Sequence, residues 1–161
     1  MARGGASAYI QPSMIDDLYS ARILTLAANM PRAGRLDAPD ASSEKISKLC
    51  GSRVLVDLKV RDGQVADFAQ EVKACALGQA AAAILGANII GARVDEIESA
   101  RDQLRAMLKA GGPAPEGRFV DLRALEPVKD YPARHASTLL AFEAAVEAAR
   151  AAERTSPAGA A

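Results

Sequence analysis

Apolar residues alternate with mostly polar ones in the middle of the chain. They recur at every second position from Val54 to Val60, a period typical of a strand with one buried face. The next four residues, Arg-Asp-Gly-Gln at 61–64, include the pair Asp-Gly. This pair favours a two-residue hairpin turn, because glycine adopts a positive φ without steric cost. We therefore predict a β-hairpin whose return strand covers residues 65–72.

Apolar residues at helical spacing predict helices on both sides of this hairpin. Ser13 is a suitable N-cap for a first helix that ends at Pro31. A run of small residues from Ala76 to Ala83 indicates a closely packed helix directly after the hairpin. Further on, the pattern predicts a helix from Val94 to Gly111, one or two helical turns at 119–125, and a last helix at 132–152.

The order of these elements decides the fold class. Residues 44–49 are expected to form a strand that pairs with the hairpin, so that three antiparallel strands follow each other without intervening helices. We therefore predict an α+β fold, in which a three-stranded antiparallel sheet packs against an N-terminal helix and several C-terminal helices. The 161 residues are enough for one core. We expect a single domain at 14–153, a disordered leader at 1–13 and a flexible tail at 154–161.

Composition and charge argue against several classes of function. Lys and Arg together equal Asp and Glu, at 20 each, and the chain has three Phe, three Tyr and no Trp. This balance is unlike a basic, aromatic-rich surface for nucleic acid. The longest apolar run, at 80–90, is too short to cross a bilayer. Two distant cysteines without a recognisable signal peptide favour the cytoplasm. We expect a soluble cytoplasmic protein without nucleic-acid or membrane partners.

No enzyme active site is recognisable in the sequence. The spacing of the glycines fits neither phosphate-binding fingerprint. The single histidine is not part of a recognisable Ser-His-Asp arrangement. We predict that the protein is not an enzyme.

The two cysteines lie at opposite ends of the predicted hairpin. Cys50 precedes its first strand, and Cys75 follows its second, directly before a helix whose dipole would favour a thiolate. The antiparallel fold-back would bring them together, although 25 positions separate them. Thiolates are preferred ligands of zinc and of iron–sulfur clusters. Because free cysteine is also among the most frequently buried residues, inert packing is the alternative.

Short motifs in a fixed order give the chain a resemblance to a known family. They are Leu18-Tyr19, Ile23-Leu24 and Pro31-Arg32-x-Gly34-x-Leu36 around the first helix, Cys50-Gly51 before the hairpin, Ala74-Cys75-Ala76-Leu77 after it, and Arg134-His135-Ala136-Ser137-Thr138-Leu139-Leu140-Ala141 near the start of the last helix. Together they resemble the U-type iron–sulfur cluster assembly scaffolds, the NifU N-terminal or IscU-like domain, over residues 18–152.

The resemblance implies a SufE/NifU-like fold and a role in iron–sulfur cluster assembly. Family members bind a transient [2Fe-2S] cluster, or zinc (Zn), and accept sulfur from a cysteine desulfurase. These cofactors, together with a cysteine desulfurase and cluster-accepting proteins as partners, are therefore what we expect. The sequence departs from the family twice: Ser52 lies where members usually have Asp, and Ser137 lies at the position of the third cysteine.

The candidate metal ligands are Cys50, Cys75 and His135, the single histidine, which lies beside the position of the missing cysteine. Two positions along a helix correspond to about 200° of rotation, so His135 and Ser137 would face nearly opposite sides if both were helical. His135 is thus either a ligand or a buried histidine of the core.

Ser52, Arg134 and Ser137 complete the candidate site. The hydroxyls are weak ligands, and Ser137 would also suit the start of a helix. Arg134 either contacts a cluster, a persulfide or an anionic group of a partner, or lies free in solvent.

Three functions are compatible with these residues. We favour a cluster scaffold or carrier that binds metal or a [2Fe-2S] cluster through Cys50 and Cys75, because both occupy ligand positions. The alternative is a sulfur acceptor or regulatory adaptor of a cysteine desulfurase, without a cluster of its own. A third is a binding surface in which neither cysteine acts. Because two chains would supply four thiolates, a homodimer that shares one cluster is a variant of the scaffold hypothesis.

Overall fold

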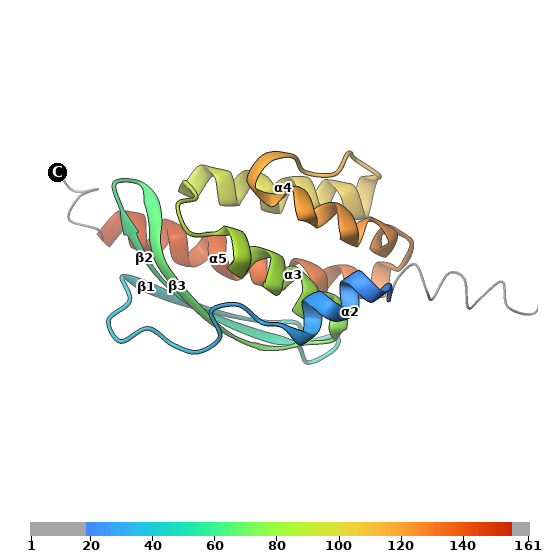
Figure 1. The fold of residues 1–161 in the computed structure, drawn as a ribbon, viewed down its shortest axis with the longest axis horizontal. Helices are drawn as coiled ribbons and strands as arrows, with labels where there is room; N and C mark the ends of the chain where they lie inside the picture. Colours follow the sequence, from blue (N-terminus) through green and yellow to red (C-terminus); the bar gives the residue numbers. More distant parts are fainter. Residues whose placement is uncertain (1–18, 156–161) are drawn as a thin grey trace, which may run out of the picture.

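An antiparallel sheet of three strands forms one layer of the computed structural model, which describes residues 19–155 (Figure 1). The strands are β1 (Ala41–Ile46), β2 (Arg53–Arg61) and β3 (Gln64–Lys73), and β2 lies in the middle. Both neighbouring pairs are antiparallel. The predicted three-stranded antiparallel sheet is confirmed.

The hairpin of β2 and β3 has the predicted pattern of burial. The alternating apolar residues from Val54 to Val60 are each at most 1% exposed. At the turn, Asp62 and Gly63 have φ values of 56° and 78°, which lie in the left-handed region that Asp-Gly accepts with little strain. Local sequence chemistry therefore fixes this turn and the two residue pairs next to it, and beyond them the register shifts between Lys59 and Val60.

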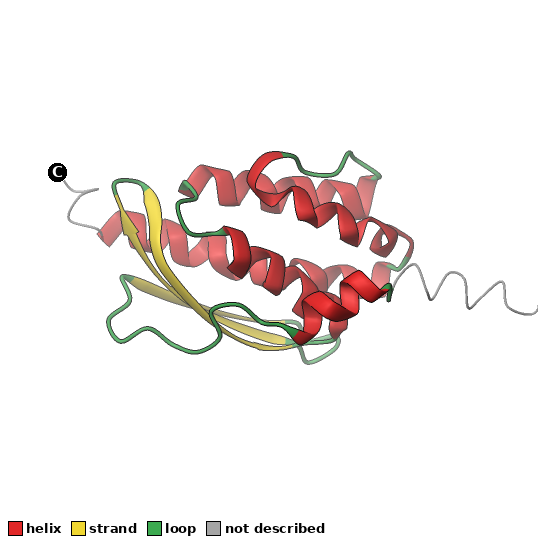
Figure 2. Ribbon diagram, in the orientation of Figure 1, coloured by secondary structure: helices red, strands yellow, loops and turns green. Residues whose placement is uncertain are grey.

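The helices pack in layers on this sheet (Figure 2). They are α2 (Ala21–Ala28), α3 (Ala76–Asn88), α4 (Val94–Ala110), the 3₁₀ segments η2 (Gly117–Asp130) and η3 (Pro132–Arg134), and α5 (His135–Thr155). Helix α5 contacts β1 and β2, and α3 contacts β3. Helix α4 packs on α5, whereas η2 packs on α3 and α4, and α2 packs on α3. This arrangement confirms the predicted α+β class. No helix within residues 19–155 is long and apolar enough to cross a membrane.

Small side chains allow the longest helix, α5, to lie close to both the sheet and α3. The alanines that it buries are Ala141, Ala144, Ala145, Ala148, Ala149 and Ala152. Its larger apolar residues, Leu139, Phe142 and Val146, are buried as predicted. Phe142 meets Phe119 of η2 edge to face, with 5.4 Å between the ring centroids. Close packing on two sides thus fixes the position of α5.

The first helix of the described chain, α2, begins at Ala21. The expected cap, Ser13, lies outside the described residues, as does the predicted leader at 1–13. Within the described chain, α2 starts at Ala21, because Ser20 has an extended backbone and its hydroxyl accepts a hydrogen bond from Ile23 N at 3.3 Å. Tyr19 therefore precedes the helix instead of belonging to it.

The first strand also differs from its predicted bounds. It covers Ala41–Ile46 and not 44–49, because residues 47–52 turn away from the sheet edge. Gly51 N donates to Ser47 O at 2.7 Å and Ser47 N donates to Ser52 O at 2.8 Å. Gly51 has a φ of 76°, which favours glycine. The result is a tight loop directly before β2.

The C-terminal third is more helical than predicted. The segment expected at 119–125 extends over the whole of η2. The last helix has a 3₁₀ first turn, η3, and α5 continues to Thr155, so that the start of the predicted tail at 154–161 is helical. Residues 156–161 lie outside the described chain.

Buried Asp57 of β2 holds the loop between α2 and β1 against the sheet. Its carboxylate accepts hydrogen bonds from Arg35 Nε at 2.6 Å, Leu36 N at 3.0 Å and Ser42 Oγ at 2.5 Å. Burial raises the pKa of Asp57, but the hydrogen bonds from Arg35, Ser42 and Leu36 outweigh it and hold the pKa below its ordinary value.

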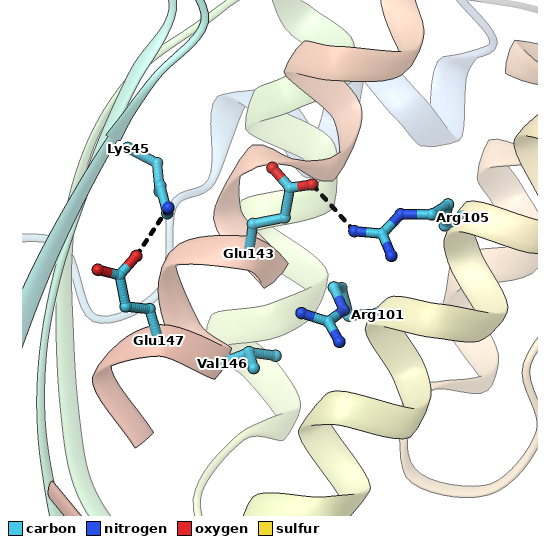
Figure 3. Close-up of a pocket in the computed structure, with 6 residues that line it drawn as sticks. All are labelled: Lys45, Arg101, Arg105, Glu143, Val146 and Glu147. Atoms are coloured by element: carbon cyan, nitrogen blue, oxygen red, sulfur yellow. Dashed lines mark hydrogen bonds and ion pairs between the residues drawn. The ribbon is translucent and has the colours of Figure 1, made fainter. Parts of the chain in front are cut away.

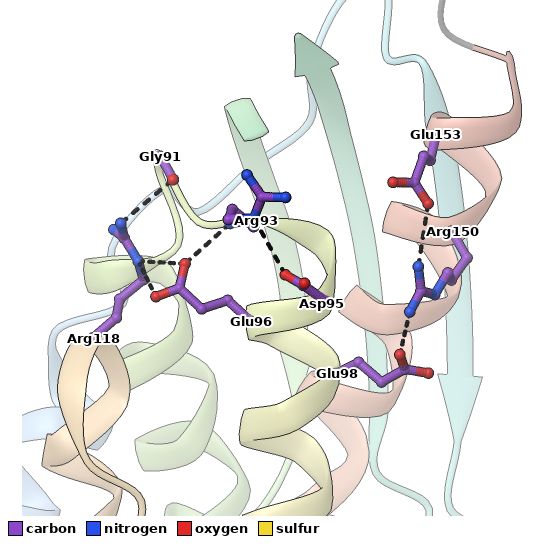
Figure 4. A network of polar contacts seen from close by, with 8 residues as sticks. All are labelled: Gly91, Arg93, Asp95, Glu96, Glu98, Arg118, Arg150 and Glu153. Atoms are coloured by element: carbon purple, nitrogen blue, oxygen red, sulfur yellow. Dashed lines mark hydrogen bonds and ion pairs between the residues drawn. The ribbon is translucent and has the colours of Figure 1, made fainter. Parts of the chain in front are cut away.

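A second polar network connects the helices, as Figure 4 shows. Arg118 donates to the backbone carbonyls of Asn88, Ile90 and Gly91 at 3.0–3.3 Å, and it pairs with Glu96 of α4. These bonds satisfy carbonyl groups at the C-terminal end of α3, which otherwise lack partners. The same view shows Arg150 of α5 paired with Glu98 of α4.

Replacing Asp57 by Asn removes the charge but keeps the shape of the side chain. We expect the free energy of unfolding at pH 7 to fall by about 1–3 kcal/mol, because hydrogen bonds to a buried charged group are lost. Since folding lowers the pKa of Asp57, its contribution is present above its ordinary pKa and disappears as the pH falls through the lowered value. Urea unfolding at neutral and acid pH measures both effects.

The matched control for this experiment is Asp37→Asn in the same loop, where the side chain is exposed. Between neutral and acid pH, the free energy of unfolding should fall less for Asp57→Asn than for the native chain. For Asp37→Asn it should fall as much as for the native chain. Equal behaviour of the two variants would contradict the role given to Asp57.

Candidate functional site

Cys50 lies exposed in the tight loop between β1 and β2. Its Sγ is 3.5 Å from Ser47 Oγ and 3.1 Å from Ser52 Oγ. Both serines are buried, and the turn at Gly51 brings them to the same side of the loop. The thiol is therefore open to solvent but has hydroxyl groups directly beside it.

These hydroxyls change the acidity of the thiol. Hydrogen bonding with Ser47, with the hydroxyl and backbone of Ser52, and with Ser137 lowers the pKa of Cys50 from 9.0 to about 7, although burial acts in the opposite direction. Near neutral pH a large share of Cys50 is thus the thiolate, which is the nucleophilic and metal-binding form.

Cys75 is the N-cap of α3 and is half-buried. Its backbone is extended, with φ −67° and ψ 171°, and its side chain makes no capping hydrogen bond. The thiol lies instead toward α5, where its Sγ is 3.4 Å from Ser137 Oγ. Gly78 makes this approach possible, because a Cβ there would lie 3.0 Å from the carbonyl oxygen of Ser137.

Ser137 in the first turn of α5 lies beside the Cys75 thiol. It is 2% exposed, its hydroxyl contacts Cys75 and donates to Arg134 O at 3.3 Å, and its hydrogen bonding lowers the pKa of Cys50. The structure therefore brings together four of the residues singled out from the sequence: Cys50, Ser52, Cys75 and Ser137.

The structure does not bring His135 to the thiols. The imidazole is 5% exposed, and its Nε2 lies 2.9 Å from the carbonyl oxygen of Val128. Among residues 19–155, no three His, Cys, Asp or Glu side chains are placed to hold a metal ion together. The predicted ligand set of Cys50, Cys75 and His135 is therefore not assembled, because the rotation between positions 135 and 137 points the ring toward η2.

Arg134 is exposed at the start of α5. Its carbonyl oxygen accepts bonds from Ser137 and from Thr138, at 3.3 and 2.7 Å, and thereby orients the Ser137 hydroxyl. Its guanidinium forms no ion pair within residues 19–155.

Sequence reasoning missed Ser47, which contributes as much to the surroundings of Cys50 as Ser52 does. A serine three positions before a cysteine, followed by glycine, was the available signal. It indicates a tight turn in which side chains at both ends meet.

Comparison with known proteins identifies the class to which this fold and site belong. The NifU-like N-terminal domain family matches residues 18–138, and the chain belongs to this family. This confirms the resemblance inferred from the sequence.

Individual relatives support the same assignment. The chain is 34% identical over 131 residues to the iron–sulfur cluster assembly scaffold protein IscU of Thermotoga maritima, a match that covers 81% of this chain and 92% of that protein. That relative is named as a scaffold and not as an enzyme. The crystal structure of a nitrogen-fixing NifU-like protein (N-terminal) from Brucella abortus is 57% identical, with a TM-score of 0.86 over 89% of this chain and 99% of that one.

A more distant structure shares the fold. It is a putative iron–sulfur cluster assembly scaffold protein for the SUF system from Fervidobacterium islandicum, 22% identical, with a TM-score of 0.76 over 83% of this chain and 98% of that one.

The different surroundings of the two thiols should give them different reactivities. We expect iodoacetamide to modify Cys50 faster than the half-buried Cys75, with a rate that rises as the pH increases through about 7. In Ser47→Ala/Ser52→Ala the midpoint should move to higher pH, because the groups that stabilise the thiolate are gone. Mass spectrometry of timed samples gives both rates.

The control is Ser99→Ala, which changes a hydroxyl on α4 that has no contact with either cysteine. An equal rate for both cysteines, or a midpoint for Cys50 that the serine substitutions leave unchanged, would contradict this description of the site.

Proposed function

We propose that the protein is an iron–sulfur cluster assembly scaffold or carrier that binds its cargo through Cys50 and Cys75. One observation carries this proposal: the register that pairs Arg53 of β2 with Lys73 of β3 brings both thiols to the same end of the sheet, where the hydroxyl of Ser137 contacts the Cys75 thiol at 3.4 Å. The pair lies at a surface, with Cys50 exposed, as the exchange of a transient cargo requires. Membership of the scaffold family supports the same reading.

The metal ligands that one chain offers fit a cluster or metal ion that is bound loosely. A [2Fe-2S] cluster has four thiolate positions, of which Cys50 and Cys75 would fill two. The hydroxyls of Ser52 and Ser137 are weak ligands in comparison with thiolates. The remaining positions would be filled from outside the chain, and a second copy would supply an identical pair. Zinc could bind to the same two thiolates with other ligands completing its tetrahedron.

The partners that follow from this proposal are a cysteine desulfurase as the sulfur source and cluster-accepting proteins as the destination. Both would have to reach the end of the molecule at which Cys50 is exposed. We propose the cytoplasm as the place where this occurs.

The low pKa of Cys50, about 7, also favours a second candidate, a sulfur acceptor or adaptor without a cluster of its own. In that case the Cys50 thiolate would attack the terminal sulfur of the desulfurase persulfide. A new S–S bond forms at Cys50, the old S–S bond breaks, and its electron pair leaves with the desulfurase cysteine as a thiolate. This reaction needs one thiol, whereas cluster binding needs both.

Anaerobic reconstitution with iron and sulfide separates the two candidates. For a scaffold we expect iron and acid-labile sulfide in near-equal amounts, lost in both Cys50→Ala and Cys75→Ala. His135→Gln is the control and should retain both, because the ring contacts Val128 and not the thiols. Chemical analysis of the purified variants measures the contents, and circular dichroism checks their folding.

The size of the loaded protein tests the shared cluster. If two copies supply the four thiolates, iron should elute from gel filtration with a dimer, and the dimer should dissociate when the cluster is removed. An iron-loaded monomer would contradict the shared cluster. Persulfide on Cys50 that persists in Cys75→Ala, without any iron, would favour the sulfur acceptor instead.

A further inference from the structure

Each segment that brings a residue to the thiol site also carries a basic side chain without an ion pair. Lys48 comes two positions before Cys50, Lys73 two positions before Cys75, and Arg134 three positions before Ser137. All three are exposed, and none forms a salt bridge within residues 19–155. Cys75 and Arg134 both contact Ser137, and the register of β2 and β3 places Arg53, which follows the Cys50 loop, opposite Lys73, so the three charges border one end of the molecule. We call them the basic rim.

The carboxylates nearby do not cancel the charge of this rim. Glu44 is paired with Arg53 at 3.0 Å, and Arg53 lies opposite Lys73 in the register of β2 and β3. Glu71, exposed and two positions before Lys73, offsets one of the three rim charges, which leaves two basic side chains in excess. The end of the molecule is thus positive, although the whole chain has a formal net charge of zero.

Exposed apolar side chains lie next to the basic rim. Leu49 is 77% exposed and Ile46 is 56% exposed, and both belong to the segment that carries Cys50. With Leu24, they are the exposed large apolar residues of the described chain. Singly exposed apolar residues need no explanation, but two beside an exposed reactive thiol indicate a contact surface.

A charged cavity elsewhere in the described chain differs in this respect. A cavity of about 370 Å³ between β1, α4 and α5 is lined by Lys45, Arg101, Arg105, Glu143, Val146 and Glu147 (Figure 3). Its charges are paired: Lys45 with Glu147 at 2.8 Å and Arg105 with Glu143 at 3.3 Å, and Arg101 with Asp102 at 2.9 Å. These side chains already satisfy one another, so this cavity offers no unpaired charge to a partner.

We propose that the basic rim, with Leu49 and Ile46, docks a partner protein that presents carboxylates around an apolar contact. This inference rests on the proposed function, because it assigns the partner side of the same thiol site. Complementary charge selects the partner and accelerates encounter, and the apolar contact prolongs the complex. A second metal-free copy does not fit, because it would bring a rim of the same sign against the first.

The experiment uses a purified cysteine desulfurase from the same organism as the probe. Its affinity for the native chain is measured at low and high salt by biolayer interferometry. The test variant is Lys48→Glu/Lys73→Glu/Arg134→Glu. The matched control is Lys59→Glu/Lys109→Glu/Arg123→Glu, because these residues also lack ion pairs but lie on segments that bring no residue to the thiols.

We expect the rim variant to bind about tenfold more weakly or worse at low salt, and to lose most of the salt dependence. The control should bind like the native chain. Leu49→Ser should bind more weakly at both salt concentrations, because its contact is not electrostatic. Loading with iron and sulfide in the absence of desulfurase should remain native in Lys48→Glu/Lys73→Glu, which keeps Arg134, so failure of docking is distinguishable from failure of the proposed function.

Three results would overturn the docking proposal. The first is an equal loss of affinity in the rim variant and the control. The second is the lack of a measurable complex with the native chain. The third is binding of a duplex DNA oligonucleotide through the rim, without any effect of Leu49→Ser, which would assign the surface to nucleic acid.

Discussion

The contact of Ser137 with Cys75, at the end of the sheet where Cys50 also lies, is the constraint on which the site depends. Cys50 and Cys75 belong to loops at the two ends of a hairpin, and neither loop by itself determines where its thiol lies relative to the other. Helix α5 supplies the fixed reference. Its buried alanines hold it against the sheet and α3, and Gly78 lets α3 approach it at the level of Ser137. The packing of the core therefore positions the chemistry at the end of the molecule.

The site combines exposure with incomplete coordination. One thiol is open to solvent and the other is half-buried, and the polar groups around them are hydroxyls, which stabilise a thiolate without competing strongly for a metal. A structural zinc site would instead enclose its metal with four protein ligands. The arrangement suits a cargo that arrives and leaves, and the surrounding unpaired charge and exposed leucine suit the proteins that would exchange it.

The sequence predicted those parts of the molecule that local chemistry determines. Asp-Gly specified the hairpin turn, and the period of two specified the buried face of β2. The bounds of β1 were missed because backbone hydrogen bonds around Gly51 end the strand at Ile46, and no side-chain pattern records them. For His135, helical geometry predicted that its side chain faces away from that of Ser137. Its hydrogen-bond partner, the Val128 carbonyl, was not predicted, because it belongs to η2, whose length was underestimated.

The central claim is that Cys50 and Cys75 form one site, and a trivalent arsenical tests it directly. Phenylarsine oxide binds tightly only where two thiols can bond to the same arsenic atom. We expect one arsenic per chain, attached to both cysteines, and its loss when either one is replaced by alanine. Independent alkylation of the two thiols at unchanged rates in the presence of the arsenical would contradict the claim, and would show that the thiols do not act together.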